Sequence, residues 1–167
     1  MYNNILYPTD GSKGADSALV HCRHLAKAYD ATVHVLHAVE HFAPYGLGGD
    51  VEVKNQRGMV GDPKGGEGGM TGSRTKRQEI KERIKAQSAE MVADAASRLG
   101  AVDTQTVVKV GNPYKVILET ASDSNADLIV MGTHGRTGLD RYLIGSVAEK
   151  VVRMSDVPVL TVRQEDT

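Results

Sequence analysis

Short runs of apolar and β-branched residues alternate along the chain with segments whose apolar residues recur at helical spacing. Turn-forming clusters such as Pro8-Thr9-Asp10-Gly11 separate them. The pattern predicts strands at residues 5–7, 32–39, 104–110, 127–131 and 157–162, and helices at 14–29, 74–99, 113–123 and 144–154. Such alternation favours a single α/β domain over residues 1–167, in which helices cover both faces of a five-stranded parallel sheet.

The sequences of two predicted strands indicate whether each strand lies at the centre or at an edge of the sheet. Residues 127–131, with the sequence DLIVM, have apolar side chains on both faces, as expected at a sheet centre. Pro158 has no backbone donor, so it belongs at an edge or near the start of a strand.

Individual residues also mark the helix ends. Asn112 and Pro113 are typical of an N-cap and a first helical position, and Gly100 suits a C-terminal stop. Either Ser12 or Asp10 fits as the cap of the helix at 14–29. For the helix at 74–99, the spacing predicts a core face made of Ile80, Ile84, Ala86, Met91, Ala95 and Leu99.

Residues 40–73 break the alternation. Ten of the 27 residues from Gly46 to Gly72 are glycine, so this stretch has little apolar surface to offset the entropy of ordering it. We therefore expect residues 43–73 to form a flexible surface insertion.

Composition narrows the class of protein. The 167 residues carry a formal net charge of −1, which gives no reason to expect a nucleic-acid partner or a membrane surface. The N-terminus lacks the features of a signal peptide, and no stretch approaches the ~18 apolar residues that span a bilayer. Cys22 is the only cysteine and lies on an apolar helical face, which favours a core position over a redox role. Together these features predict a soluble, cytoplasmic protein.

The most informative segment runs from Gly132 to Ser146. It follows the buried strand at 127–131 and leads into a helix, with glycine at 132, 135 and 145. Glycines at a strand end let backbone amides approach a phosphate, and the N-terminus of the following helix attracts an anion. We expect that a side chain at Gly132 or Gly145 would block this approach. The plainer alternative is that these glycines serve turns and helix packing.

Other known phosphate-binding motifs do not fit. The segment has no Gly-Lys-Ser/Thr, and the turn at residues 10–14 lacks the dinucleotide fingerprint. Arg136 and Arg141 lie close enough in sequence to bring positive charge to a phosphate chain, although Arg141 also fits a solvated surface position. Asp10 fits a simple helix cap as well as a ligand contact.

The pattern G-x2-G-x9-G-S after a strand ending in Val-Met resembles the nucleotide signature of ATP-binding universal stress proteins. ILYPTDGS, VHVLHAVE, GNPYKVILETA and SDVPVLTVR resemble further segments of that family, so the likeness spans nearly the whole chain outside residues 43–73. The resemblance implies a doubly wound sheet of order 3-2-1-4-5, with the ligand at the switch point between the first and fourth strands.

The resemblance also implies roles for particular residues. Val39 would contact adenine through its backbone, Asp10 would lie near the ribose or the phosphates, and Pro8 and Thr9 would shape the pocket. Met131 and Gly132 would border the base and ribose. The phosphates would be held by His134, Gly135, Arg136, Gly145, Ser146 and Val147.

The resulting hypothesis is an ATP-binding stress-response or signalling module that dimerises through residues 157–162. ATP would carry Mg²⁺ near Asp10, and no metal site made of protein side chains alone is expected. The sequence offers no evident general base, which favours a binding protein over an enzyme. Two alternatives stay open, a slow ATP hydrolase or phosphotransferase and a nucleotide-independent, chaperone-like interaction domain.

Overall fold

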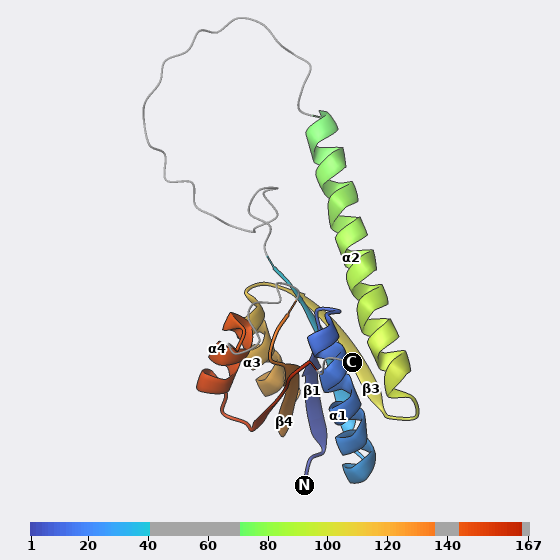
Figure 1. The fold of residues 1–167 in the computed structure, drawn as a ribbon. Coiled ribbons are helices and arrows are strands. Elements are labelled where there is room, and N and C mark those ends of the chain that lie inside the picture. The colour runs from blue at the N-terminus through green and yellow to red at the C-terminus, as the bar shows by residue number, and fades with distance from the viewer. Residues whose placement is uncertain (41–70, 136–143, 165–167) are drawn as a thin grey trace, which may run out of the picture.

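The computed structural model describes residues 1–40, 71–135 and 144–164, and Figure 1 shows the fold. Strands and helices alternate along the chain as predicted. Their bounds are β1 Asn4–Pro8, α1 Lys13–Tyr29, β2 Thr32–Val39, α2 Thr71–Leu99, β3 Thr104–Val110, α3 Pro113–Asp123, β4 Leu128–Gly132, α4 Ser146–Met154 and β5 Val159–Val162. The insertion predicted at residues 43–73 lies outside the described residues, except that its last three residues already belong to α2.

The five strands form one parallel sheet in the order β3-β2-β1-β4-β5, which confirms the predicted doubly wound topology. Strands β1 and β4 are neighbours, so the winding of the chain reverses between them. Helices α1 and α2 cover one face of the sheet, and α3 and α4 cover the other (Figure 1). In such a sheet, ligands bind outside the carboxyl ends of the strands at the point of reversal.

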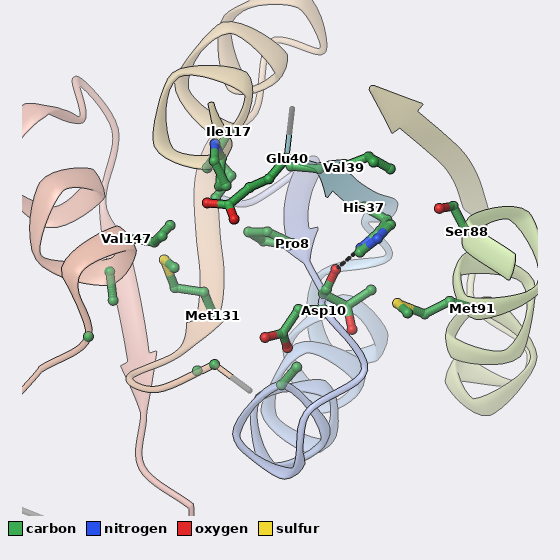
Figure 2. A pocket seen from close by; sticks show the side chains of 18 of the residues that line it. Pro8, Asp10, His37, Val39, Glu40, Ser88, Met91, Ile117, Met131 and Val147 are labelled. Atoms are coloured by element: carbon green, nitrogen blue, oxygen red, sulfur yellow. Dashed lines mark hydrogen bonds between the residues drawn. The ribbon is translucent and has the colours of Figure 1, made fainter. Parts of the chain in front are cut away.

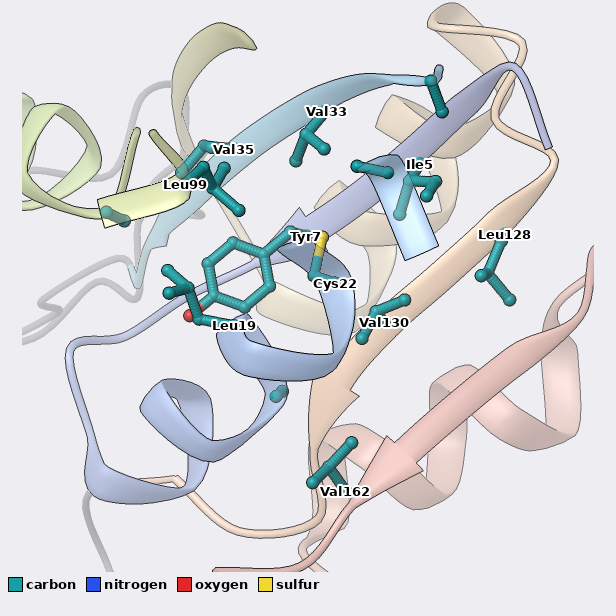
Figure 3. Close-up of a cluster of buried hydrophobic side chains, with 14 of the residues drawn as sticks. Ile5, Tyr7, Leu19, Cys22, Val33, Val35, Leu99, Leu128, Val130 and Val162 are labelled. Atoms are coloured by element: carbon teal, nitrogen blue, oxygen red, sulfur yellow. The ribbon is translucent and has the colours of Figure 1, made fainter. Parts of the chain in front are cut away.

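Alternation along the strands divides the core into two layers. Ile5 and Tyr7 face α1 and α2, whereas Leu6 between them faces α3 and α4. Every residue of β4 except its last is buried, as the two-faced apolar sequence predicts for a central strand. Figure 3 shows the layer beneath α1, where Tyr7 and Cys22 lie among aliphatic side chains.

Buried polar groups in these layers are mostly accounted for. The Tyr7 hydroxyl donates a hydrogen bond of 2.8 Å to the carbonyl of Ala15, and burial raises the pKa of this phenol. Burial also raises the pKa of the Cys22 thiol to about 12, so the thiol stays protonated and unreactive at neutral pH. Cys22 is therefore a core residue, as predicted.

Helix α2 differs in detail from its predicted form. Its inward face carries Ile80, Ile84, Met91, Ala95 and Leu99, but Ala86 is exposed. The buried residue at that level is Ser88, whose hydroxyl donates back to the carbonyl of Ile84 at 2.8 Å. The hydrophobic pattern selected Ala86 as the buried residue of this turn. Ser88 can face inward instead because its hydroxyl forms a hydrogen bond within the helix. The N-terminal half of α2 extends past the end of the sheet (Figure 1).

The helix ends agree with the sequence in most places. Ser12 caps α1 by accepting a hydrogen bond from the Ala15 amide at 3.2 Å, which decides between the two proposed caps. Asn112 occupies the N-cap position of α3 and Pro113 begins the helix, as predicted, although the Asn112 side chain makes no capping hydrogen bond. Gly100 ends α2 at a φ of +74°, a left-handed conformation that glycine adopts without strain.

Strand β5 lies at the edge of the sheet, directly after Pro158. The carbonyl of Pro158 accepts the Ile129 amide at 2.9 Å, so the proline joins the sheet through the one backbone group it can offer. Within the described residues, no helix is long and apolar enough to cross a membrane.

Candidate functional site

A pocket of about 790 Å³ opens at the carboxyl ends of the strands, at the point where the winding reverses. This volume lies within the range of roughly 300–1,000 Å³ that small-molecule sites occupy. Its walls come from the ends of β1, β2 and β4, from the start of α4, and from α2 and α3 (Figure 2). Segments far apart in sequence thus converge on one concave site.

The structure brings together every predicted site residue that it describes. The residues that line the pocket are Pro8, Thr9, Asp10, Val39, Met131, Gly132, His134, Gly135, Gly145, Ser146 and Val147. Arg136 and Arg141 lie outside the described residues.

The turn after β1 presents Asp10 to this pocket through a set of local hydrogen bonds. One Asp10 carboxylate oxygen accepts the Ser12 amide at 3.0 Å, and the Thr9 hydroxyl accepts the Gly11 amide at 3.2 Å. From β2, Nδ1 of His37 donates to the Thr9 carbonyl at 2.7 Å (Figure 2). That bond fixes the hydrogen on Nδ1, because a carbonyl only accepts. The position of Asp10 therefore depends on its own turn and on the neighbouring strand.

Gly132 lines the pocket and is also constrained by neighbouring backbone. A Cβ at this position would lie 2.6 Å from the carbonyl carbon of Gly14 and 3.0 Å from the Ala15 amide nitrogen. The end of β4 thus packs backbone to backbone against the start of α1. Gly14 shows the reciprocal constraint, since its Cβ would lie 2.5 Å from the His134 carbonyl oxygen. A side chain at Gly132 would disturb the fold before it met a phosphate.

Gly145 is also constrained by neighbouring backbone. Its amide donates to the Thr133 carbonyl at 2.7 Å, and a Cβ there would lie 2.9 Å from the same oxygen. This amide is therefore not available to a phosphate, contrary to the simple cradle expected from the sequence. Gly145 instead joins the end of β4 to the start of α4.

The open donors of the site belong to the first turn of α4. Ser146, Val147 and Ala148 line the pocket, and no hydrogen bond between described residues uses their amide groups. The first amides of a helix have no intrahelical acceptor, and the helix dipole adds partial positive charge at this end. This arrangement suits an anion such as a phosphate.

His134 adds a further polar group to this end of the pocket. Its Nδ1 shares a hydrogen bond of 2.9 Å with the Thr133 hydroxyl. Its Nε2 is buried and has no hydrogen-bond partner in the described part of the chain. An unpartnered buried nitrogen beside free helix amides is consistent with a polar ligand at this position.

Val39 is less open to a base than the family resemblance implies. Its carbonyl already accepts the Gly111 amide at 2.9 Å, which leaves one lone pair. Its side chain points toward Ser88 of α2, away from Pro8 (Figure 2).

Sequence reasoning missed one whole wall of the pocket. Helix α2 contributes Ile80, Ile84, Gln87, Ser88 and Met91. Further lining residues are His37 of β2, Glu40 directly after it, and Pro113 and Ile117 of α3. Periodicity had identified three of the α2 residues as an inward face. Nothing in one sequence says that this face continues past the sheet and borders a cavity.

A metal bound by protein side chains alone has no evident site. Within residues 1–40, 71–135 and 144–164, no three His, Cys, Asp or Glu side chains are grouped closely enough to hold an ion. The Asp10 carboxylate lies close to Gly135, since its second oxygen is 2.6 Å from where a Gly135 Cβ would be.

Comparisons with known proteins agree on one family. The model of the universal stress protein family matches residues 1–163. Universal stress protein MJ0531 of Methanocaldococcus jannaschii is 35% identical over 164 residues, which cover 98% of this chain and 84% of the relative. Universal stress protein MJ0577 of the same organism is 30% identical over 169 residues, covering 100% and 98%.

Solved structures show the same architecture. The structure of MJ0577 matches with a TM-score of 0.76 at 26% identity, covering 100% of this chain and 99% of that one. A universal stress protein solved in complex with cAMP matches with a TM-score of 0.60 at 24% identity, covering 98% of each chain.

Proposed function

The chain belongs to the universal stress protein family, and from this premise we propose that it binds ATP and acts as a stress-response or signalling module. ATP would occupy the pocket at the carboxyl ends of β1 and β4. We infer a cytoplasmic location from Cys22, the only cysteine, which has no second thiol with which to form an intrachain disulfide.

The observation that carries the proposal is that no hydrogen bond between described residues uses the first-turn amides of α4, which border the same pocket as several apolar side chains. The amides of Ser146, Val147 and Ala148 would hold the phosphates, with the Ser146 hydroxyl as a further donor. Beside them, Met131 and Pro8 offer apolar surface to a base and ribose (Figure 2). A nucleotide requires hydrogen-bond donors for its phosphates and apolar surface for its base, and this pocket offers both.

The position of Asp10 also fits a magnesium ion that arrives with ATP. Mg²⁺ binds through one or two carboxylates together with substrate phosphates. Asp10 supplies one carboxylate, held by the Ser12 amide and close to Gly135 in the proposed phosphate region. Mg²⁺ would neutralise phosphate charge there, while Asp10 and the α4 amides orient the chain of phosphates.

Titration calorimetry tests the proposal directly. ATP and ADP are expected to bind more tightly than AMP, because further phosphates reach more of the α4 amides. The series includes cAMP, since a protein of the same fold was solved with it. If no nucleotide binds to the folded protein, the proposal fails and a nucleotide-independent interaction domain is favoured. Steady-state phosphate release that Asp10→Ala abolishes while ATP still binds would favour a slow hydrolase.

We also propose a homodimer formed through residues 157–162. Strand β5 is an edge of the described sheet, and an uncovered edge strand invites pairing with another chain. Antiparallel pairing with the same strand of a second copy would cover both edges. Light scattering at micromolar concentration is expected to give the mass of two chains. A monomer mass would reject this assembly.

A further inference from the structure

Glu40 is an exposed residue that directly follows β2, and it lines the same pocket. Its carboxylate reaches across Pro8 toward Ile117, whereas the side chain of Val39 points the opposite way (Figure 2). No hydrogen bond or ion pair between described residues uses this carboxylate. An acceptor without a partner in the described part of the chain therefore lines the pocket.

The surface beneath Glu40 is apolar. Pro8, Ile117, Met131 and Val147 face the same space from four different elements (Figure 2). Ile117 and Met131 are only 3% and 6% exposed, so they are held firmly by the core behind them. Walls of this kind suit a flat heteroaromatic ring better than a phosphate chain.

Two groups of opposite charge border this pocket. The start of α4, at Ser146, carries the positive end of a helix dipole and unpaired donors. Glu40 carries a negative charge, and in the view of Figure 2 Pro8 separates it from Asp10. A phosphate is attracted to the α4 amides and repelled by the Glu40 carboxylate. A nucleotide thus has one favoured orientation, with its base toward Glu40.

We propose that Glu40 is a specificity-determining residue, which accepts a hydrogen bond from the exocyclic amino group of a purine such as adenine. This inference rests on the proposed nucleotide function, and it identifies the amino group of the base as the part of the ligand that Glu40 recognises. The backbone of Val39 is poorly placed to do so alone, since its carbonyl already accepts the Gly111 amide. A carboxylate only accepts, so it favours a base edge that carries a donor.

The test compares two ligands on three proteins by calorimetry. The ligands are ATP and purine riboside 5′-triphosphate, which has neither the amino group nor a ring N–H at that edge. Wild-type protein is expected to bind ATP about tenfold more tightly, the effect of one hydrogen bond to a charged group. Glu40→Leu is expected to bind both ligands equally, within about twofold. Glu40→Gln keeps an acceptor oxygen without the charge and should show an intermediate ratio.

The outcomes separate this inference from the proposed function. If wild-type protein binds neither triphosphate, both fail together. If it binds both but their affinity ratio is the same in Glu40→Leu, ATP binding stands and the role of Glu40 is overturned. Should Glu40→Leu bind neither ligand, the ratio in Glu40→Gln decides, and an unchanged wild-type ratio would overturn the inference.

Discussion

Gly132→Ala is expected to lower the free energy of unfolding by about 3 kcal/mol, the upper part of the usual range for overpacking. The added Cβ would lie 2.6 Å from backbone atoms of Gly14, and backbone cannot rotate away as a side-chain end can. Either β4 or the start of α1 must shift. Urea denaturation followed by circular dichroism measures the loss, and Gly132→Val should cost more.

The matched control is Gly135→Ala, the same change three residues later. Among the described residues, the new Cβ would contact only the Asp10 carboxylate, at 2.6 Å, which is the end of a side chain and not backbone. Stability is expected to change by less than about 1 kcal/mol, while affinity for Mg²⁺–ATP falls because Asp10 is displaced. If Gly132→Ala instead folds as stably as wild type but loses ATP, the glycine serves phosphate approach, as the sequence first suggested.

Ser146→Pro is expected to weaken ATP binding by about 10- to 100-fold relative to Ser146→Ala, the effect of one amide hydrogen bond to a charged phosphate. Both variants lack the hydroxyl, and only proline also removes the amide hydrogen. Proline is well tolerated as the first residue of a helix. Gly145 before it has ψ of 149°, the extended conformation that a residue preceding proline prefers. Calorimetry with ATP measures the difference.

Lys13→Pro provides the control for this pair. Lys13 is the first residue of α1, follows Ser12 with ψ of 161°, and is not among the residues that line the pocket. The Lys13→Pro variant tests whether a proline at a helix start alters the affinity for ATP by itself. No change in that affinity is expected. Equal ATP affinity in Ser146→Ala and Ser146→Pro would remove the Ser146 amide from the proposed phosphate site.

Much of the candidate site was predictable from sequence because it lies at strand ends. Pro8, Asp10, Met131 and Ser146 each follow or end a recognisable strand or begin a helix. Parallel strands bring their carboxyl ends to one edge, so residues distant in sequence had to meet there. The family resemblance supplied the strand order, which periodicity alone leaves open.

Other features depended on neighbours that a single sequence does not reveal. Gly132 was interpreted mainly as space for a ligand, but the backbone of Gly14 also excludes a side chain at this position. The Gly145 amide was expected to donate to a phosphate, but it donates to the carbonyl of Thr133. Ser88 was passed over because a hydroxyl suggests a surface, although it bonds within its own helix.

The alternation of short apolar strands and amphipathic helices determined the parallel α/β sheet by itself, because each element has one pattern of burial that allows it to pack. Only the tertiary structure decided which glycines touch backbone, which amides stay unpaired, and that α2 and Glu40 border the pocket. These features are set by distances between segments that are remote in sequence. A periodic pattern indicates which face of an element is buried, but not what lies against that face.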